Sequence, residues 1–175
     1  MALEEGHPAP EFDLPTAGGG RARLADFKGK PLVLYFYPKD DTPGCTEEAQ
    51  DFADAYPELQ AAGVEVVGVS KDGTASHEKF KVKYDLPFTL ASDQQGGMVE
   101  AYGSWVEKSM YGKEYMGIDR STFLIDGDGT VRRVWRNVKV PGHVAEVLAA
   151  MTDTAAIGDG DGDGDAEGDG EDDSQ

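Results

Sequence analysis

The chain has 175 residues, of which 39% are hydrophobic, and its formal net charge is −18 at pH 7. This length supports one domain with a substantial core, and the negative charge argues against nucleic-acid binding, which needs a basic face to neutralise phosphates. The longest apolar run, PLVLYFY, is too short to span a bilayer, and the single cysteine, Cys45, excludes an internal disulfide.

The N-terminal residues carry no targeting pattern. The opening MALEEGHPAPEFDLP contains acids and prolines where a secretory signal peptide needs basic and then apolar residues. Together with the single cysteine, this favours a reduced, cytoplasmic protein. The following AGGGRAR, at 17–23, lacks the glycine pattern of a dinucleotide-binding loop, and we expect a flexible turn there.

Two apolar runs in the first half of the chain are typical of buried strands. Residues 31–38 read PLVLYFYP and residues 64–70 read VEVVGVS, both rich in β-branched or aromatic side chains. Between them, apolar side chains recur at helical spacing from Cys45 onward, and Gly63 provides a helix stop. These apolar positions are Ala49, Phe52, Ala53, Tyr56 and Leu59.

The second half continues the alternation of strands and helices. We expect a short helix at 74–85, a strand at 88–93 and a brief helix at 96–104. Residues 121–135, STFLIDGDGTVRRVW, predict a β-hairpin, because two strand-like runs flank a DGDG turn whose residues tolerate positive φ. A closing helix follows at 140–151.

The element order β-α-β-α-β-α-β-β-α predicts an α/β fold with a mixed central sheet flanked by helices. We place this domain at residues 1–153. Residues 154–175 form an acidic, Gly/Asp-rich tail that cannot bury apolar surface, and we predict disorder there. The tail resembles the start of an EF-hand loop at Asp159, but Gly170 stands where that loop needs a glutamate, so no calcium site is expected.

Acidity extends beyond the tail. Residues 157–175 hold nine acids and no base, and without them the chain still carries a net charge of −9. An acidic surface keeps a protein soluble where salt screens charge, since the Debye length shrinks to roughly 3 Å at 1 M salt. The composition therefore indicates a salt-adapted, halophilic protein, with an ordinary acidic cytosolic protein as the alternative.

Cys45 is placed where a strand gives way to a helix. Thr42 can cap the helix through its side-chain oxygen, Pro43 suits the first helical position, and Gly44 allows close backbone approach. Cys45 then lies in the first turn, where unpaired amides and the helix dipole favour a thiolate and lower the pKa of the thiol. A buried, inert cysteine is the alternative, but such a residue would lie within the apolar rows.

Acidic neighbours oppose this ionisation. Four carboxylates crowd the turn, and like charge disfavours a thiolate, so a positive group must come from elsewhere in the chain. Arg120 stands directly before the strand STFLID. Spacing alone does not distinguish a role for Arg120 at the cysteine from a surface ion pair. The four acids are Asp40, Asp41, Glu47 and Glu48.

Rival cysteine chemistries fit the sequence poorly. Glu48 occupies the second position of a Cys-x-x-Cys motif, and Asp51 stands where a phosphatase-type cysteine needs an arginine. A cysteine hydrolase needs a histidine base. His7 lies in the flexible N-terminus, and we expect His77 and His143 to be surface residues of helices. The scattered histidines also argue against a metal site.

The residues around Cys45 resemble a known family. PKDDTPGC, at 38–45, matches the Pro-x-x-x-Thr-x-x-Cys active-site motif of the peroxiredoxins. The segments CTEEAQDF, YGKEYMGIDRSTFLIDGDG and GHPAPEFDLP resemble its bacterioferritin-comigratory, or Q-type, subfamily, and the similarity runs from about Gly6 to Met151. The resemblance implies a thioredoxin-like fold and a thiol peroxidase.

The resemblance also implies roles for four catalytic residues. Cys45 would be the peroxidatic nucleophile, whose thiolate attacks a peroxide oxygen and becomes a sulfenic acid. Arg120 would stabilise the thiolate and the peroxide, because the transition state spreads negative charge over sulfur and two oxygens. Thr42 would hydrogen-bond the peroxide through its hydroxyl, and Pro38 would pack over the sulfur and shield it from water.

Two further positions match the family's substrate pocket. The backbone amides of Gly44 and Cys45 would complete the pocket, and Glu48 would orient Arg120. The resemblance implies no metal and no organic cofactor.

The catalytic cycle departs from the subfamily at one position. Many Q-type members carry a resolving cysteine five residues after the first, where this chain has Gln50. The sulfenic acid would therefore be reduced by an external thiol, either a small thiol or a redoxin-type protein. The chain would reduce hydrogen peroxide and organic hydroperoxides as a monomer or homodimer. The alternative is a redox-sensing binding protein whose oxidised Cys45 is recognised by a partner.

Overall fold

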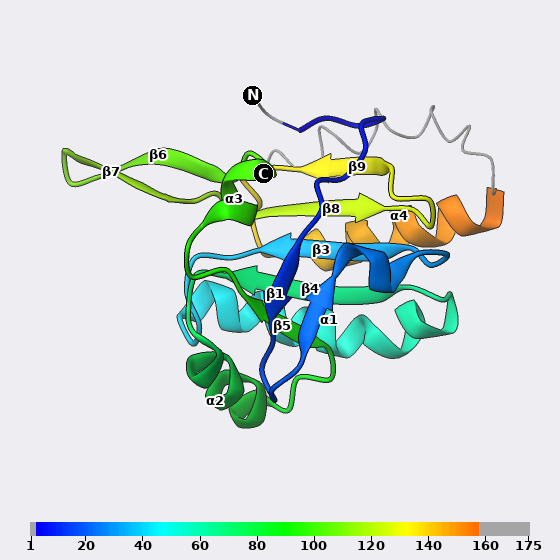
Figure 1. The fold of residues 1–175 in the computed structure, drawn as a ribbon, viewed down its shortest axis with the longest axis horizontal. Coiled ribbons are helices and arrows are strands. Elements are labelled where there is room, and N and C mark those ends of the chain that lie inside the picture. The colour runs from blue at the N-terminus through cyan, green and yellow to red at the C-terminus, as the bar shows by residue number, and fades with distance from the viewer. Residues whose placement is uncertain (1–2, 158–175) are drawn as a thin grey trace.

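A five-stranded mixed sheet forms the centre of the computed structural model, which describes residues 3–157 (Figure 1). The strand order is β5-β4-β3-β8-β9. β3, β4 and β5 are parallel and β8 and β9 are antiparallel to their neighbours, so the sheet is mixed as predicted. The strands are β3 (Leu32–Phe36), β4 (Glu65–Ser70), β5 (Thr89–Ser92), β8 (Ser121–Ile125) and β9 (Val131–Trp135).

Two hydrophobic cores lie on opposite faces of this sheet. In β3, Val33 and Tyr35 belong to one core, whereas Leu32 and Leu34 belong to the other. This alternation follows from the period of two in a strand. Because both faces are covered, every residue of β3 is buried and its sequence is continuously apolar.

Helices cover both faces close to the predicted positions. α1 (Pro43–Ala61) and α4 (His143–Ile157) pack against each other over the first core (Figure 1). α2 (Thr74–Tyr84) adds Phe80 to the same core. α3 (Gly97–Ala101) contributes to the second core.

Two short antiparallel ribbons outside the central sheet are not among the predicted elements. β1 (Asp13–Pro15) pairs with β2 (Arg21–Arg23), so the flexible turn expected at 17–23 is instead partly a strand. A short 3-10 helix (Leu24–Phe27) follows it. β6 (Trp105–Met110) pairs with β7 (Lys113–Ile118), and this second ribbon projects from the body of the protein (Figure 1).

The C-terminal helix passes the proposed domain boundary at residue 153, since α4 continues to Ile157. Residues 158–175 lie outside the described residues, so the predicted disordered tail and the judgement on its calcium loop stay predictions. Of the helices that the structure describes, none combines the length and the apolar character needed to cross a membrane.

Candidate active site

Cys45 lies in the first turn of α1, beyond the carboxyl end of β3. Thr42 is the N-cap residue and Pro43 the first helical residue, so the predicted helix start is confirmed. The Cys45 side chain is 1% exposed. Within residues 3–157, the amides of Gly44 and Cys45 donate no hydrogen bond, as expected for the first turn of a helix. Two amide donors are therefore available in the helix turn that carries Cys45.

Arg120 joins Cys45 to Glu48 across this helix end. It directly precedes β8, the neighbour of β3 in the sheet, and its side chain reaches α1. Arg120 Nη2 donates to Cys45 Sγ at 3.5 Å, and Nη1 donates to Glu48 Oε1 at 2.7 Å. Burial lowers the pKa of Arg120, but attraction to Glu48 and Cys45 outweighs burial and raises it. The guanidinium therefore remains a cation beside the sulfur.

Glu48 is fully buried, as Cys45 is. Burial raises the pKa of Glu48 to about 7, although the charge and hydrogen bond of Arg120 act in the opposite direction. Oε1 accepts the Arg120 hydrogen bond, and Oε2 has no hydrogen-bond partner among the described residues. The contact with Nη1 is the one expected of a residue that orients Arg120.

The backbone of α1 comes close to Arg120 at Gly44. A Cβ atom added at Gly44 would lie 3.2 Å from Arg120 Nη2, which is tighter than ordinary van der Waals contact. That nitrogen is the one that donates to Cys45 Sγ. A side chain at position 44 would therefore push against the hydrogen bond to the sulfur.

Thr42 and Pro38 lie in the loop that leads from β3 to Cys45. The Thr42 hydroxyl makes no capping hydrogen bond to the helix, which corrects the capping expected from the sequence. It donates instead to Lys39 O at 2.9 Å, inside the same loop. The Thr42 oxygen still has lone pairs for a further partner. Pro38 is partly exposed at the start of that loop.

The acids around Cys45 have partners that the sequence did not indicate. Asp40 pairs with His77 at 2.7 Å, and Asp41 pairs with Lys83 at 2.8 Å. With Glu48 bound to Arg120, three of the four nearby carboxylates are matched by separate cations or hydrogen-bond donors. Arg120 therefore does not have to outweigh all four, as the sequence alone suggested.

The two helical histidines are buried, so the prediction of surface positions is wrong. His77 is 0% exposed and His143 is 4% exposed. His143 Nε2 lies 2.8 Å from the Thr122 hydroxyl. The position of each histidine in a helix did not predict its burial, because its hydrogen-bond partners come from distant parts of the chain.

One group of residues within 3–157 has ligand atoms close enough together to hold a metal ion, namely Asp40, Asp72 and His77. Their ligand atoms already bond to one another and to neighbouring donors. A metal would have to break those bonds, so the arrangement is better described as a hydrogen-bond network.

Comparison with known proteins finds peroxiredoxins among the relatives of this chain. The pattern of the AhpC/TSA family matches residues 6–134. The chain is 54% identical to a putative peroxiredoxin Bcp of Coxiella burnetii, over 86% of this chain and 100% of the relative. It is 48% identical to peroxiredoxin Bcp of Bacillus subtilis, over 87% of this chain and 98% of the relative.

A solved structure is also similar to this chain. The bacterioferritin comigratory protein of Xanthomonas campestris, crystallised in a study of its alkyl peroxide reduction, is 44% identical. It aligns with a TM-score of 0.79 over 82% of this chain and 92% of that protein. The similarity confirms the predicted thioredoxin-like α/β fold.

Proposed function

The chain belongs to the AhpC/TSA family as a thiol peroxidase of the Bcp type, and we propose that its Cys45 reduces hydrogen peroxide and small organic hydroperoxides. One observation carries the proposal: Arg120 donates to Cys45 Sγ while Glu48 holds the other end of the guanidinium. A cation so placed stabilises negative charge on sulfur and on an approaching peroxide. The alkyl peroxide reduction studied in the Xanthomonas protein supports the organic substrates.

The chemistry needs a thiolate and donors for the oxygens. The Cys45 thiolate attacks one peroxide oxygen, the O–O bond breaks, and the sulfur gains an oxygen to become a sulfenic acid. The departing hydroxide or alkoxide takes up a proton and leaves as water or an alcohol. In this scheme, Arg120, the Thr42 hydroxyl and the Gly44 and Cys45 amides bind the two oxygens, and Pro38 shields the sulfur.

An external thiol would complete the cycle, because Cys45 is the only cysteine. The thiol attacks the sulfenic sulfur, releases water and leaves a mixed disulfide. A second thiol then releases Cys45 and carries away the disulfide. Gln50 stands where many relatives of this subfamily have a resolving cysteine, and it lies on the exposed side of α1. We propose a small thiol or a redoxin-type protein as the reductant.

The surroundings of the enzyme belong to the proposal as well. A single cysteine suits a reducing, cytoplasmic compartment, and the acidic surface suits a high-salt medium. We propose that the enzyme works there as a monomer or homodimer.

Peroxide consumption with a supplied dithiol tests the function. Cys45→Ser should abolish consumption, because no other sulfur can replace the nucleophile. Arg120→Ala should slow the oxidation of Cys45 by about a hundredfold or more, the usual effect of removing one charge-stabilising donor. Arg132→Ala is the matched control, since Arg132 pairs with Asp126 at the other end of β8.

Two results would contradict the proposal. The first is oxidation of Arg120→Ala at the wild-type rate, which would mean that the guanidinium has no part in catalysis. Alternatively, if wild-type Cys45 is oxidised once and no thiol recycles it, the redox-sensing interpretation replaces the enzymatic one.

A further inference from the structure

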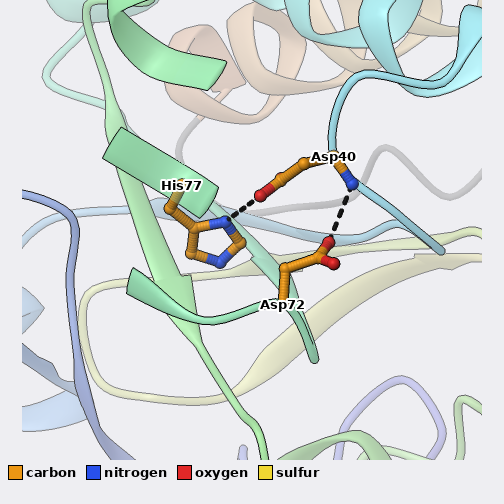
Figure 2. A group of neighbouring side chains, drawn as sticks. All are labelled: Asp40, Asp72 and His77. Atoms are coloured by element: carbon orange, nitrogen blue, oxygen red, sulfur yellow. Dashed lines mark hydrogen bonds and ion pairs between the residues drawn. The ribbon is translucent and has the colours of Figure 1, made fainter. Parts of the chain in front are cut away.

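The loop between β3 and α1 carries the residues before Cys45. It is hydrogen-bonded to α2 and to the segment that leads into α2. Asp40 lies in this loop, Asp72 follows β4, and His77 is on α2 (Figure 2). The Asp40 amide donates to Asp72 Oδ2 at 2.8 Å, and the Asp40 carboxylate meets His77 Nδ1 at 2.7 Å. The backbone and the side chain of one loop residue are thus both held by hydrogen bonds.

The ring of His77 has acceptors at both nitrogens. Nε2 lies 2.9 Å from Ala91 O, which can only accept, so Nε2 carries a hydrogen. Nδ1 faces the Asp40 carboxylate. A neutral imidazole would point a lone pair at that carboxylate, so one additional proton must lie between His77 and Asp40.

Asp40 is the ionised member of this pair. Burial alone would raise the pKa of Asp40, but hydrogen bonds from His77, Tyr37 and Ser76 outweigh burial and lower it. The two side chains are 0% and 4% exposed, so the hydrogen bond between them is shielded from water. Tyr37 and Ser76 donate to the carboxylate from β3's end and from α2, so both carboxylate oxygens are satisfied.

We propose that the buried, hydrogen-bonded Asp40–His77 pair is a positioning device that holds the β3–α1 loop, and through it the Cys45 sulfur, in place beside Arg120. The inference rests on the proposed peroxidase function and extends it to residues that do not touch the sulfur. His77 and Asp40 act only through the loop, so they are positioning residues and not catalytic ones.

Geometry explains why such a device is useful here. The bond from Arg120 to the sulfur is a single hydrogen bond of 3.5 Å, and only four residues separate Asp40 from Cys45. Asp41, the next residue, has a φ of 62°, a backbone conformation that residues other than glycine rarely adopt. Its carboxylate accepts hydrogen bonds from Lys83 and Tyr84 at the end of α2. Two consecutive aspartates therefore tie the loop to the same helix.

We expect the exposed pair and the buried pair to differ in their effect on the oxidation of Cys45. The Asp41–Lys83 pair is largely solvent-exposed, and exposed ion pairs contribute little. The Asp40–His77 pair is buried, and removing one partner leaves the other polar group buried and unsatisfied, which is far more damaging than replacing both. A double-mutant cycle can separate these cases.

The test compares Asp40→Asn, His77→Gln and the double variant in the full chain. Each single variant should oxidise with hydrogen peroxide about ten- to a hundredfold more slowly in a single turnover, because small displacements of reacting groups have effects of that size. The double variant should be no slower than the worse single variant. Lys83→Ala should change the rate less than about fivefold.

His143→Gln controls for a general loss of stability. It removes a buried imidazole that bonds to Thr122, outside the β3–α1 loop. Thermal melts and circular dichroism would establish that each variant is folded. We expect His143→Gln to melt earlier than wild type and yet to oxidise at the wild-type rate. If His77 had only a structural role, His77→Gln should behave in the same way.

Two further readouts are independent of peroxide. Alkylation of Cys45 by iodoacetamide should slow in the single variants, and hydrogen exchange of the loop amides should accelerate. If wild type consumes no peroxide, the proposed function fails, while these two readouts still decide the positioning role. Folded single variants with wild-type oxidation, alkylation and exchange would overturn the inference, and so would rate losses equal to that of His143→Gln.

Discussion

Gly44 leaves little space between α1 and Arg120. Gly44→Ala places a methyl group 3.2 Å from Arg120 Nη2, so the guanidinium that bonds to the sulfur must shift by a few tenths of an ångström. We expect the oxidation of Cys45 to slow by about tenfold, since catalysis is sensitive to displacements of this order. Stability should not fall, because alanine is favoured over glycine in helices by up to about 1 kcal/mol. Stopped-flow oxidation and thermal melts would measure both.

Gly97→Ala provides the comparison. Gly97 also begins a helix, and a Cβ atom there would meet nothing within 4 Å. This variant should keep wild-type oxidation kinetics. Equal rates for Gly44→Ala and Gly97→Ala would mean that the close approach at position 44 has no effect on the reaction.

Glu48 gives the protein a pH-dependent stability of defined sign. Burial raises the pKa of Glu48 in the folded protein to about 7, from a usual 4.5. The folded state thus binds this proton more tightly than the unfolded state. The resulting stabilisation is complete below pH 4.5 and is lost as pH rises through about 7.

Glu48→Gln removes this titration. The variant also removes the ionic partner of Arg120, so its absolute stability can be lower at every pH. The diagnostic quantity is the difference in free energy of unfolding, wild type minus variant, from urea denaturation between pH 4.5 and pH 8. We expect that difference to decline as pH rises. A constant difference would show that Glu48 titrates alike in the folded and unfolded states.

Among the strands, those that the sequence predicted are buried in the central sheet, and those that it missed lie outside that sheet. β3 and β4 were predicted because strands covered on both faces are continuously apolar, and the β8–β9 hairpin because DGDG marks its turn. The β6–β7 ribbon has no comparable pattern, since it projects into solvent and exposes apolar and charged side chains alike. β1 and β2 have three residues each, too few to establish a period.

The site was predictable where a local motif defines it. Cys45 and its helix start are encoded in adjacent residues, and the resemblance pointed to Arg120. The Asp40–His77 pair was missed because its partners are 37 residues apart. A histidine on a polar-looking helix gives no indication of burial, and the binding of Asp40 to it depends on how α2 packs against the sheet.

Gly68 shows how closely the central strands pack. A Cβ atom at Gly68 in β4 would lie 3.0 Å from the Tyr35 ring and from Leu90 Cδ2. Tyr35 in turn stacks on Phe52 of α1, with ring centroids 4.6 Å apart. We expect Gly68→Ala to lower the free energy of unfolding by about 1–3 kcal/mol, as overpacking in a core does. Urea denaturation would measure this loss.

Leu90→Ala tests the cause. It removes one of the two side chains that the new methyl group meets, so the double variant should lose less stability than the sum of the single losses. Strict additivity would show that Leu90 does not resist the added methyl group.

At the scale of the whole molecule, the excess of acids is the dominant electrostatic feature. The chain has 34 acids and 16 bases. Exposed ion pairs such as Asp13–Arg21 offset a few of them, but pairs of this kind contribute little. Net charge far from zero keeps a protein soluble but opposes its compact state through self-repulsion.

Salt should therefore stabilise this protein. Raising potassium chloride from 0.1 M to 1 M shortens the Debye length from about 10 Å to about 3 Å, which screens repulsion between surface carboxylates. We expect the melting temperature to rise over this range. Deleting residues 158–175 changes the net charge from −18 to −9, so the shortened chain should show a smaller rise and an unchanged rate of Cys45 oxidation. A melting temperature that falls with salt would mean that attractive ion pairs outweigh the repulsion, and a slower oxidation would assign the C-terminal residues a part in the reaction.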